Sequence, residues 1–155
     1  MKLHKHEEIW VIFAVIVILG SMVITGYQAF ALGMGPPSHK DTIDPNNVDN
    51  EAPFDEPGVF EVGDNEYDVV MTLEAFAFNP GDIEVPVGAK VNFIMTSKDV
   101  THGMQIVDTN VNAMVLPGHI QKVSQTFSKP GEYLILCNEY CGIGHQLMAT
   151  TITVK

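Results

Sequence analysis

One short segment near the end of the chain gathers groups that could bind a metal or react as nucleophiles. The segment CNEYCGIGHQLM, residues 137–148, holds the only two cysteines, Cys137 and Cys141, followed by His145 and Met148. Glycines stand between these residues and allow the backbone to curl, so that thiol, imidazole and thioether groups can converge. Four kinds of chemistry fit this set: a disulfide, a zinc site, a catalytic thiol and a copper site.

The spacing ranks these alternatives without closing any of them. A disulfide is the default for two exported cysteines, but it does not need His145 and Met148 at ligand spacing. Structural zinc rarely takes methionine, and its cysteines usually stand closer together in the chain. A catalytic cysteine gives no reason for a second thiol. Thiolate, thioether and imidazole together favour copper by ligand softness.

A copper site needs a further histidine, and His102 in SKDVTHGM is the best candidate. It follows a strand pattern, and a neighbouring loop there could meet the cysteine segment. A mononuclear blue-copper site uses one cysteine, two histidines and a weak axial methionine, so this set has one cysteine extra. Two thiolates four residues apart can both bridge two copper ions, which would leave each copper one histidine and one weak axial ligand.

The elements that must position these residues are short strands. From Tyr67 onward, runs such as YDVVMTLEAF and AKVNFIMTS alternate apolar and polar residues, and KVSQTF, EYLILC and TTITVK follow. Pro-Gly turn signals separate the runs, and no amphipathic helix of useful length appears. Residues 66–155 are therefore predicted to form a small β-sandwich or Greek-key barrel. EYLILC places Cys137 at the end of a strand, with a loop after it.

The preceding residues 33–65 are rich in Pro, Gly, Asn and acidic residues and lack apolar periodicity, which predicts a tether or surface wrap without a core element. The net charge is -11, and all eight basic residues are lysines. An acidic chain without arginine is a poor nucleic-acid binder, so no nucleic-acid partner is expected. The acidity fits either a solvated surface or a docking surface for a lysine-rich partner.

Residues 1–32 are predicted to be a membrane anchor. No charge interrupts residues 9–32, and 24 residues of helix reach about 36 Å, enough to cross a hydrocarbon core of about 30 Å. A cleaved signal peptide is the competing interpretation, because Lys2 and Lys5 precede the apolar run and the small-x-small motif Ala29-Phe30-Ala31 lies at its end. Both interpretations leave the N-terminus in the cytoplasm and export the rest of the chain.

These motifs together resemble subunit II of haem–copper cytochrome c oxidases, most closely the short single-anchor form of B-type oxidases. The resemblance covers nearly the whole chain. Its supports are the anchor, AFAFNPGDIEVPVGAKVNF, DVTHGM, FSKPGEYLILC and CNEYCGIGHQLM. It implies a cupredoxin-like Greek-key β-sandwich or barrel preceded by one transmembrane helix.

The resemblance also implies a dinuclear copper centre, CuA. In it Cys137 and Cys141 bridge two coppers, His102 and His145 bind one copper each, and two weak axial ligands complete the set. These axial ligands are Met148 and the backbone carbonyl of Glu139. In many relatives the matching glutamate side chain also reaches a magnesium ion at the interface with subunit I, although short B-type forms often lack this glutamate.

Three further residues receive expectations from the same motifs. Asp99 could orient a ligand loop or simply stabilise a turn. Phe76 and Phe78 could lie near a donor-facing surface, although core packing is the commoner role for such residues. The chain departs from the family at Met104, where relatives often carry an aromatic residue.

The function implied is that of an electron-entry subunit in the plasma membrane, with the copper domain on the outer face and the anchor in lipid. It would take electrons from an external cytochrome c or small copper protein and pass them to haem in subunit I, where oxygen is reduced. A membrane-tethered copper chaperone or storage module is the alternative. A nitrous oxide reductase needs a longer chain, and quinol oxidase subunits have lost the copper ligands.

Overall fold

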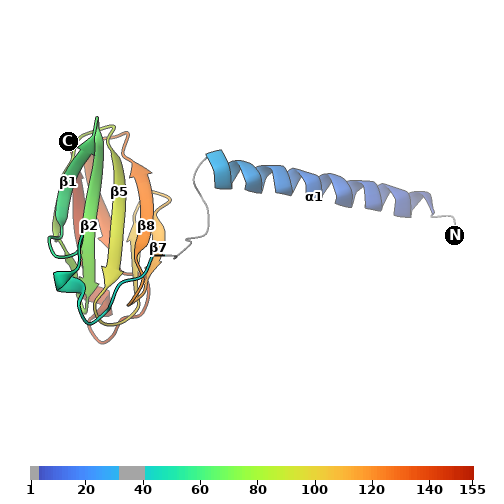
Figure 1. The fold of residues 1–155 in the computed structure, drawn as a ribbon. Helices are drawn as coiled ribbons and strands as arrows, with labels where there is room; N and C mark the ends of the chain where they lie inside the picture. Colours follow the sequence, from blue (N-terminus) through green and yellow to red (C-terminus); the bar gives the residue numbers. More distant parts are fainter. Residues whose placement is uncertain (1–3, 32–40) are drawn as a thin grey trace. The chain divides into compact units, whose positions relative to one another are not determined.

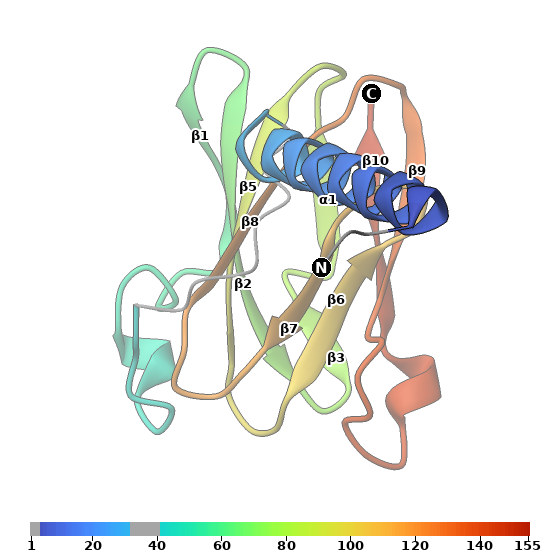
Figure 2. The same cartoon turned by 90° about the vertical axis from the view of Figure 1, so that its right-hand side faces the viewer.

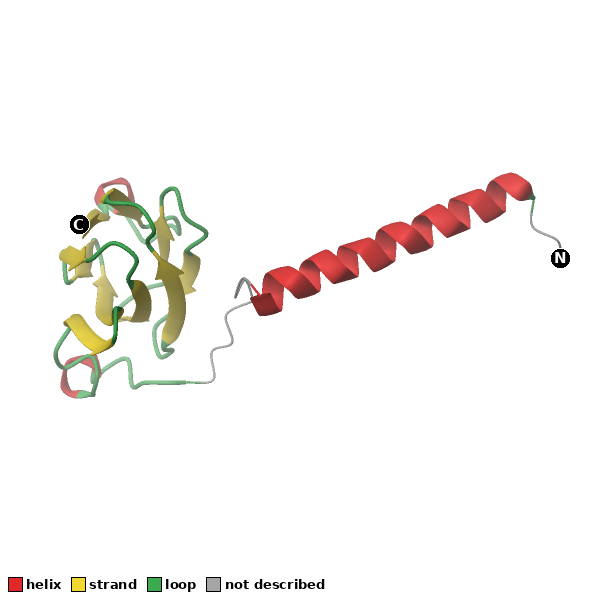
Figure 3. Ribbon diagram, turned by 90° about the horizontal axis from the view of Figure 1, so that it is seen from above, coloured by secondary structure: helices red, strands yellow, loops and turns green. Residues whose placement is uncertain are grey.

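A computed structural model describes residues 4–31 and 41–155, as one helix and one β unit. The helix α1 (Lys5–Ala31) contains an uninterrupted apolar run with a mean hydropathy of 2.6, and none of its residues is buried. By length and composition it is able to cross a membrane. Figure 3 shows α1 as the long helix, whereas the β unit consists of strands and loops with two short helical turns. The predicted tether residues 33–40 lie outside the described residues.

The β unit contains ten strands in the described residues, and Figure 1 follows them along the chain. They are β1 (Gly58–Gly63), β2 (Glu66–Glu74), β3 (Ala77–Asn79), β4 (Asp82–Val85), β5 (Lys90–Ser97), β6 (His102–Ile106), β7 (Asn112–Val115), β8 (Gln121–Thr126), β9 (Gly131–Leu136) and β10 (Ala149–Val154). The 3-10 turns are η1 (Val48–Asn50) and η2 (His145–Leu147). The predicted strand runs correspond to β2, β5, β8, β9 and β10.

The strands form two mixed sheets that pack face to face. One sheet has the order β1-β2-β5-β8 with β3 paired to β2, and the other has the order β4-β10-β9-β6-β7. The pairs β2–β5 and β4–β10 are parallel, and the remaining pairs are antiparallel. Figure 2 shows the two layers, with β2 and β5 in one and β9 and β10 in the other. This architecture confirms the predicted sandwich.

Alternation along the strands builds the core between the sheets. In β2 the odd-numbered apolar residues face inward and are fully buried, as are their counterparts in β5. The second sheet contributes apolar residues of β6, β9 and β10 to the same core. Cys137, Cys141 and Met148 belong to this core cluster, so the ligand segment is an extension of the hydrophobic interior rather than a surface appendage.

The described part of the predicted linker differs from the expectation of a segment without a core element. Ile43, Val48 and Phe54 pack with Val70 of β2 into a small second core, and Phe54 is fully buried. Residues 58–63 form β1, which pairs with β2. The physical reason is that Val70 of β2 and its partner Ile94 of β5 are apolar side chains on the outer face of this sheet, and they require a cover. The boundaries of the three predicted parts stay a prediction.

Candidate metal centre

Two segments from the second sheet position the candidate ligands. Cys137 follows the last residue of β9, and Met148 precedes the first residue of β10. The two strands are neighbours, and the Cys137 N–H donates to the Met148 carbonyl at 3.1 Å, which closes the neck of the loop. We call residues 137–148 the ligand loop. His102 comes from the first position of β6, rather than from the loop that the sequence suggested.

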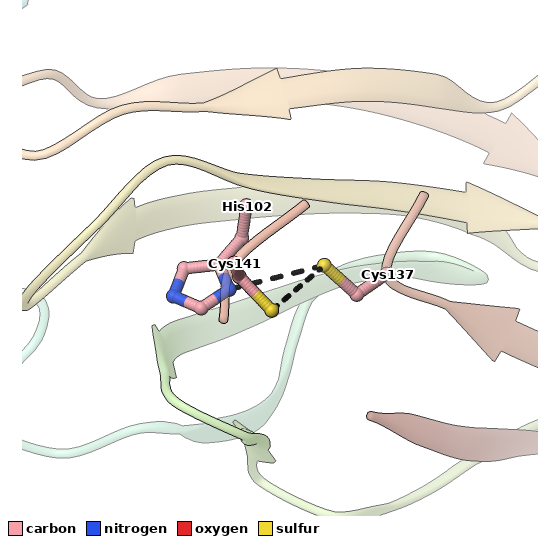
Figure 4. Close-up of side chains that lie close together, drawn as sticks. All are labelled: His102, Cys137 and Cys141. Atoms are coloured by element: carbon pink, nitrogen blue, oxygen red, sulfur yellow. Dashed lines mark hydrogen bonds between the residues drawn. The ribbon is translucent and has the colours of Figure 1, made fainter. Parts of the chain in front are cut away.

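The side chains predicted to bind metal converge. Cys137 Sγ lies 3.7 Å from Cys141 Sγ and 3.9 Å from His102 Nδ1 (Figure 4). Cys141 Sγ lies 3.5 Å from His145 Nδ1 and 3.8 Å from Met148 Sδ. The sulfurs of Cys137 and Cys141 are too far apart for a disulfide, whose S–S bond is about 2.05 Å. Each cysteine thus faces one histidine.

The candidate ligands form a buried cluster of polar and reactive side chains. His102 is fully buried, and Cys137, Cys141 and Met148 are nearly so. Among the described residues, His102, Cys137 and Cys141 form the one group of three whose ligand atoms all lie within 4.8 Å of one another. Two thiols, two imidazoles and a thioether in a dry site fit copper, because soft sulfur and borderline nitrogen donors select that metal.

Asp99 contacts the imidazole of His102. Its Oδ1 lies 2.8 Å from His102 Nε2, on the ring edge opposite Nδ1 and the cysteines. Partial burial raises the pKa of Asp99. The hydrogen bonds from His102 and from the backbone N–H groups of Val100 and Ala75 outweigh that effect and hold the pKa below its usual value. A charged carboxylate on Nε2 leaves Nδ1 free to accept a metal.

The second cysteine is a protonated thiol in the metal-free chain. Burial, followed by the hydrogen bond and the charge of neighbouring Cys137, raises the pKa of Cys141 to about 11. A metal that binds here must therefore displace protons, since the thiolate is the ligand form.

The carbonyl of Glu139 also points into the cluster. Its oxygen lies 3.2 Å from Cys137 Sγ, which acts as the donor in the metal-free chain. The Glu139 side chain is half-buried and is not part of the three-residue ligand group. A magnesium role for this carboxylate stays a prediction.

The two phenylalanines have different places. Phe78 of β3 is buried in the core between the sheets, which agrees with core packing, the commoner of the two roles considered for it. Phe76 is half-buried, and its ring lies against the ligand loop. A Cβ added at Gly144 would overlap this ring, with 2.7 Å to Cε2, and one at Gly142 would lie 3.0 Å from Cε1. The two glycines therefore accommodate Phe76.

The sequence did not single out the outer surface of the ligand loop. Tyr140, Ile143 and Leu147 are the most exposed large hydrophobic side chains among the described residues of the β unit. The Tyr140 ring lies 5.9 Å from that of His145, which is half-buried. Hydrophobic periodicity cannot detect these residues, because they lie in a loop. The presence of three large apolar residues between the predicted ligands could have identified them in the sequence. Met104, where the sequence departs from the family pattern, is fully buried in the core.

The comparisons with known proteins agree with this geometry. The family model "Cytochrome C oxidase subunit II, periplasmic domain" matches residues 71–155. The chain is 40% identical over 162 residues to a cytochrome c oxidase subunit 2 of Thermus thermophilus, which covers 99% of this chain and 96% of that protein. A second subunit 2 from Thermus thermophilus is 46% identical over 125 residues, covering 79% of this chain and 93% of that protein.

Solved structures give the same result. A chain of a heme-copper terminal oxidase dimer is similar over 97% of this chain and all of its own length, with a TM-score of 0.78 and 30% identity. The periplasmic domain of cytochrome oxidase subunit II from Bradyrhizobium japonicum covers 57% of this chain and 83% of its own, with a TM-score of 0.53 and 19% identity. The second likeness supports the cupredoxin-like fold alone.

Proposed function

The chain belongs to the cytochrome c oxidase subunit II family, and we propose that it is the electron-entry subunit of its oxidase, with a dinuclear copper CuA centre at the ligand loop. A subunit of this family is part of an oxidoreductase complex in a membrane, and α1 is long and apolar enough to serve as the anchor. Bound to the loop, a copper pair would supply reversible one-electron chemistry.

The observation that carries the proposal is the convergence of six donor groups from two segments. We assign Cys137 and Cys141 as the thiolates that would be shared by the two coppers, and His102 and His145 as the imidazoles that would each bind one copper. Met148 and the Glu139 carbonyl would complete the set as weak ligands. The separations of 3.2–3.9 Å between these donors in the metal-free chain support the assignment. Both thiols face each other, which a single-copper site does not require.

The scaffold suits electron transfer. A backbone hydrogen bond between Cys137 and Met148 closes the neck of the ligand loop. His102 lies in a strand, and the Asp99 carboxylate contacts its ring. Ligands held this firmly change position little when the charge of the site changes, so the reorganisation energy of electron transfer is small. A copper chaperone needs accessible ligands for metal exchange, and the burial of His102 and both cysteines argues against that alternative.

The partners follow from the family and from the surface. We propose that haem-bearing subunit I accepts the electrons, and that an external cytochrome c or small copper protein donates them. The exposed apolar side chains Tyr140, Ile143 and Leu147 lie on the same loop as half-buried His145 and offer a contact surface for a partner. The net charge of -11 would steer a basic donor over longer distances.

We further propose that the anchor places the copper domain on the outer face of the plasma membrane. Lys2 and Lys5 lie on the N-terminal side of the apolar run, and basic residues beside a membrane helix favour the cytoplasm. The whole assembly would then receive electrons outside the cell membrane and deliver them to haem within it.

Rapid-mixing spectroscopy on the assembled oxidase tests this function. Mixed with a reduced cytochrome c under anaerobic conditions, the wild-type complex is expected to lose its copper absorption before the haem of subunit I becomes reduced. A complex carrying Cys141→Ser should show neither the copper band nor rapid haem reduction. Haem reduction at an undiminished rate in the Cys141→Ser complex would refute the entry role.

A further inference from the structure

The ligand loop crosses strand β6 in contact with its backbone at Gly103. A methyl group added at Gly103 would overlap Oδ1 of Asn138 and would lie 2.9 Å from the backbone nitrogen of Glu139 and 3.0 Å from that of Asn138. Separations below 3.0 Å are essentially never seen for real Cβ atoms, so any side chain here would push the loop outward. Glycine is needed at this position for space rather than for an unusual backbone conformation.

A hydrogen bond to the neighbouring strand β7 also holds the ligand loop. Asn138 Nδ2 donates a hydrogen bond to Oδ1 of Asn112 at 2.9 Å, and Asn112 lies on β7, the neighbour of β6. Both asparagines are exposed, so water competes for this bond and it is a weak tether by itself. The close approach at Gly103 is therefore the firmer determinant of where Asn138 and Glu139 lie.

The residues on either side of this contact belong to the metal site. His102 directly precedes Gly103 and sends its side chain to the opposite face of β6, toward Cys137. Glu139, whose nitrogen would meet the added methyl group, presents its carbonyl oxygen 3.2 Å from Cys137 Sγ. One strand segment thus supplies a candidate imidazole ligand on one face, and on its other face it contacts the backbone of the residue whose carbonyl approaches Cys137.

We propose that Gly103 is a positioning residue for the copper centre, because it lets Asn138 and Glu139 approach β6 and so fixes the Glu139 carbonyl beside the cysteines. The inference rests on the proposed function, which assigns this carbonyl as a weak axial ligand. A larger residue at position 103 would draw the carbonyl away from its copper. Weaker oxygen donation disfavours the oxidised metal, so the reduction potential would rise.

The test uses the full-length chain in detergent, loaded with copper. Gly103→Ala is expected to keep the wild-type copper content, to raise the reduction potential in a redox titration, and to alter the copper hyperfine splitting in the EPR spectrum. Gly81→Ala is the matched control, since a methyl group there meets only the Phe78 carbonyl at 3.9 Å, and it should behave as wild type. A Gly103→Ala chain with the wild-type potential and splitting would overturn the inference.

A second variant covers the case in which Gly103→Ala does not fold. Gly103→Ala/Asn138→Gly removes the overlap with Oδ1 and retains the close backbone contacts, so it should fold and shift the potential in the same direction by a smaller amount. An unshifted potential in this variant also overturns the inference. Failure of the wild-type chain itself to bind two coppers would instead overturn the proposed function, so the two failures are distinguishable.

Discussion

The Asp99 carboxylate lies 2.8 Å from Nε2 of His102, while Nδ1 of the same ring faces Cys137 Sγ at 3.9 Å. The ring is thus held between a carboxylate and a thiol, and both of its nitrogens have a partner. Asp99 also accepts a hydrogen bond from the backbone N–H of Ala75, so the turn after β2 shares in this arrangement. We propose from the contact with His102 that Asp99 orients this ring in addition to stabilising the turn.

Asp99→Asn is expected to weaken copper binding. The amide is nearly the same size but carries no charge, so the imidazole loses basicity and its fixed orientation. Loss of such a partner typically costs about 10–100-fold in metal affinity. Competition with a copper chelator on the full-length chain measures the change, and Asp82→Asn, at an exposed position of β4, is the control. Equal affinities for wild type and Asp99→Asn would show that Asp99 has no role in the site.

Gly144→Ala is expected to disrupt the ligand loop, because its methyl group would enter the ring of Phe76. The displaced segment carries His145, so copper content and the copper absorption band should fall. The double variant Phe76→Ala/Gly144→Ala removes the clash and should recover most of the band. No recovery in the double variant would mean that the ring contact is not the cause.

The local pattern of the sequence explains why so much of the site could be predicted. Cys137, Cys141, His145 and Met148 lie in one loop, and its neck is fixed by the pairing of β9 with β10. Ligands that lie this near to one another in the sequence can be recognised without knowledge of the tertiary structure. The partner His102 came from a separate segment, and the resemblance to a known family supplied its pairing with this loop.

The parts that escaped prediction depend on contacts between distant segments. The sequence HGMQI of β6 does not alternate, because the ligand loop covers Gly103 on the outer face while His102 and Met104 face inward. Residues 41–57 carry isolated apolar residues among acidic ones, without any period. Their burial is decided by the outer face of β2, which no local pattern within 41–57 reveals.

Phe54→Ala tests whether residues 41–57, the N-terminal wrap over β2, stabilise the domain. Phe54 is fully buried against Val48 and Val70, so its truncation should lower the free energy of unfolding by about 3–5 kcal/mol. Denaturant unfolding of the copper-free chain measures this change. Val62→Ala, at a side chain that is 55% exposed, is the control and should cost much less. A cost for Phe54→Ala no larger than that of the control would mean that the wrap contributes little.

Glu66 is expected to contribute to the loss of folding stability of the domain at acid pH. The hydrogen bond from Asn92 at 3.0 Å, followed by Lys90 at 2.8 Å, lowers the pKa of Glu66 in the folded chain. Its stabilisation is therefore present above the usual glutamate pKa and is lost as the pH falls through the lowered value. Glu66→Gln should destabilise the copper-free chain at pH 7 and have a smaller effect at pH 3, since these pH values lie about one unit or more on either side of the usual glutamate pKa of about 4.3.

The exposed position of Glu66 keeps this effect small, so a matched variant is needed. Glu61→Gln on β1 changes the same charge on an exposed side chain. Thermal unfolding midpoints of the three chains at both pH values give the comparison. The assignment to Glu66 fails if Glu61→Gln shows the same pH dependence as Glu66→Gln.

Copper analysis combined with EPR spectroscopy of the purified full-length chain decides whether the centre is dinuclear. We expect two coppers per chain and, in the oxidised protein, the multi-line spectrum of one unpaired electron shared between two copper nuclei. Cys141→Ser should lose that spectrum, since one of the two bridging thiolates is gone. One copper per wild-type chain, with the simple spectrum of a single copper nucleus, would contradict the dinuclear centre and with it the proposed electron-entry role.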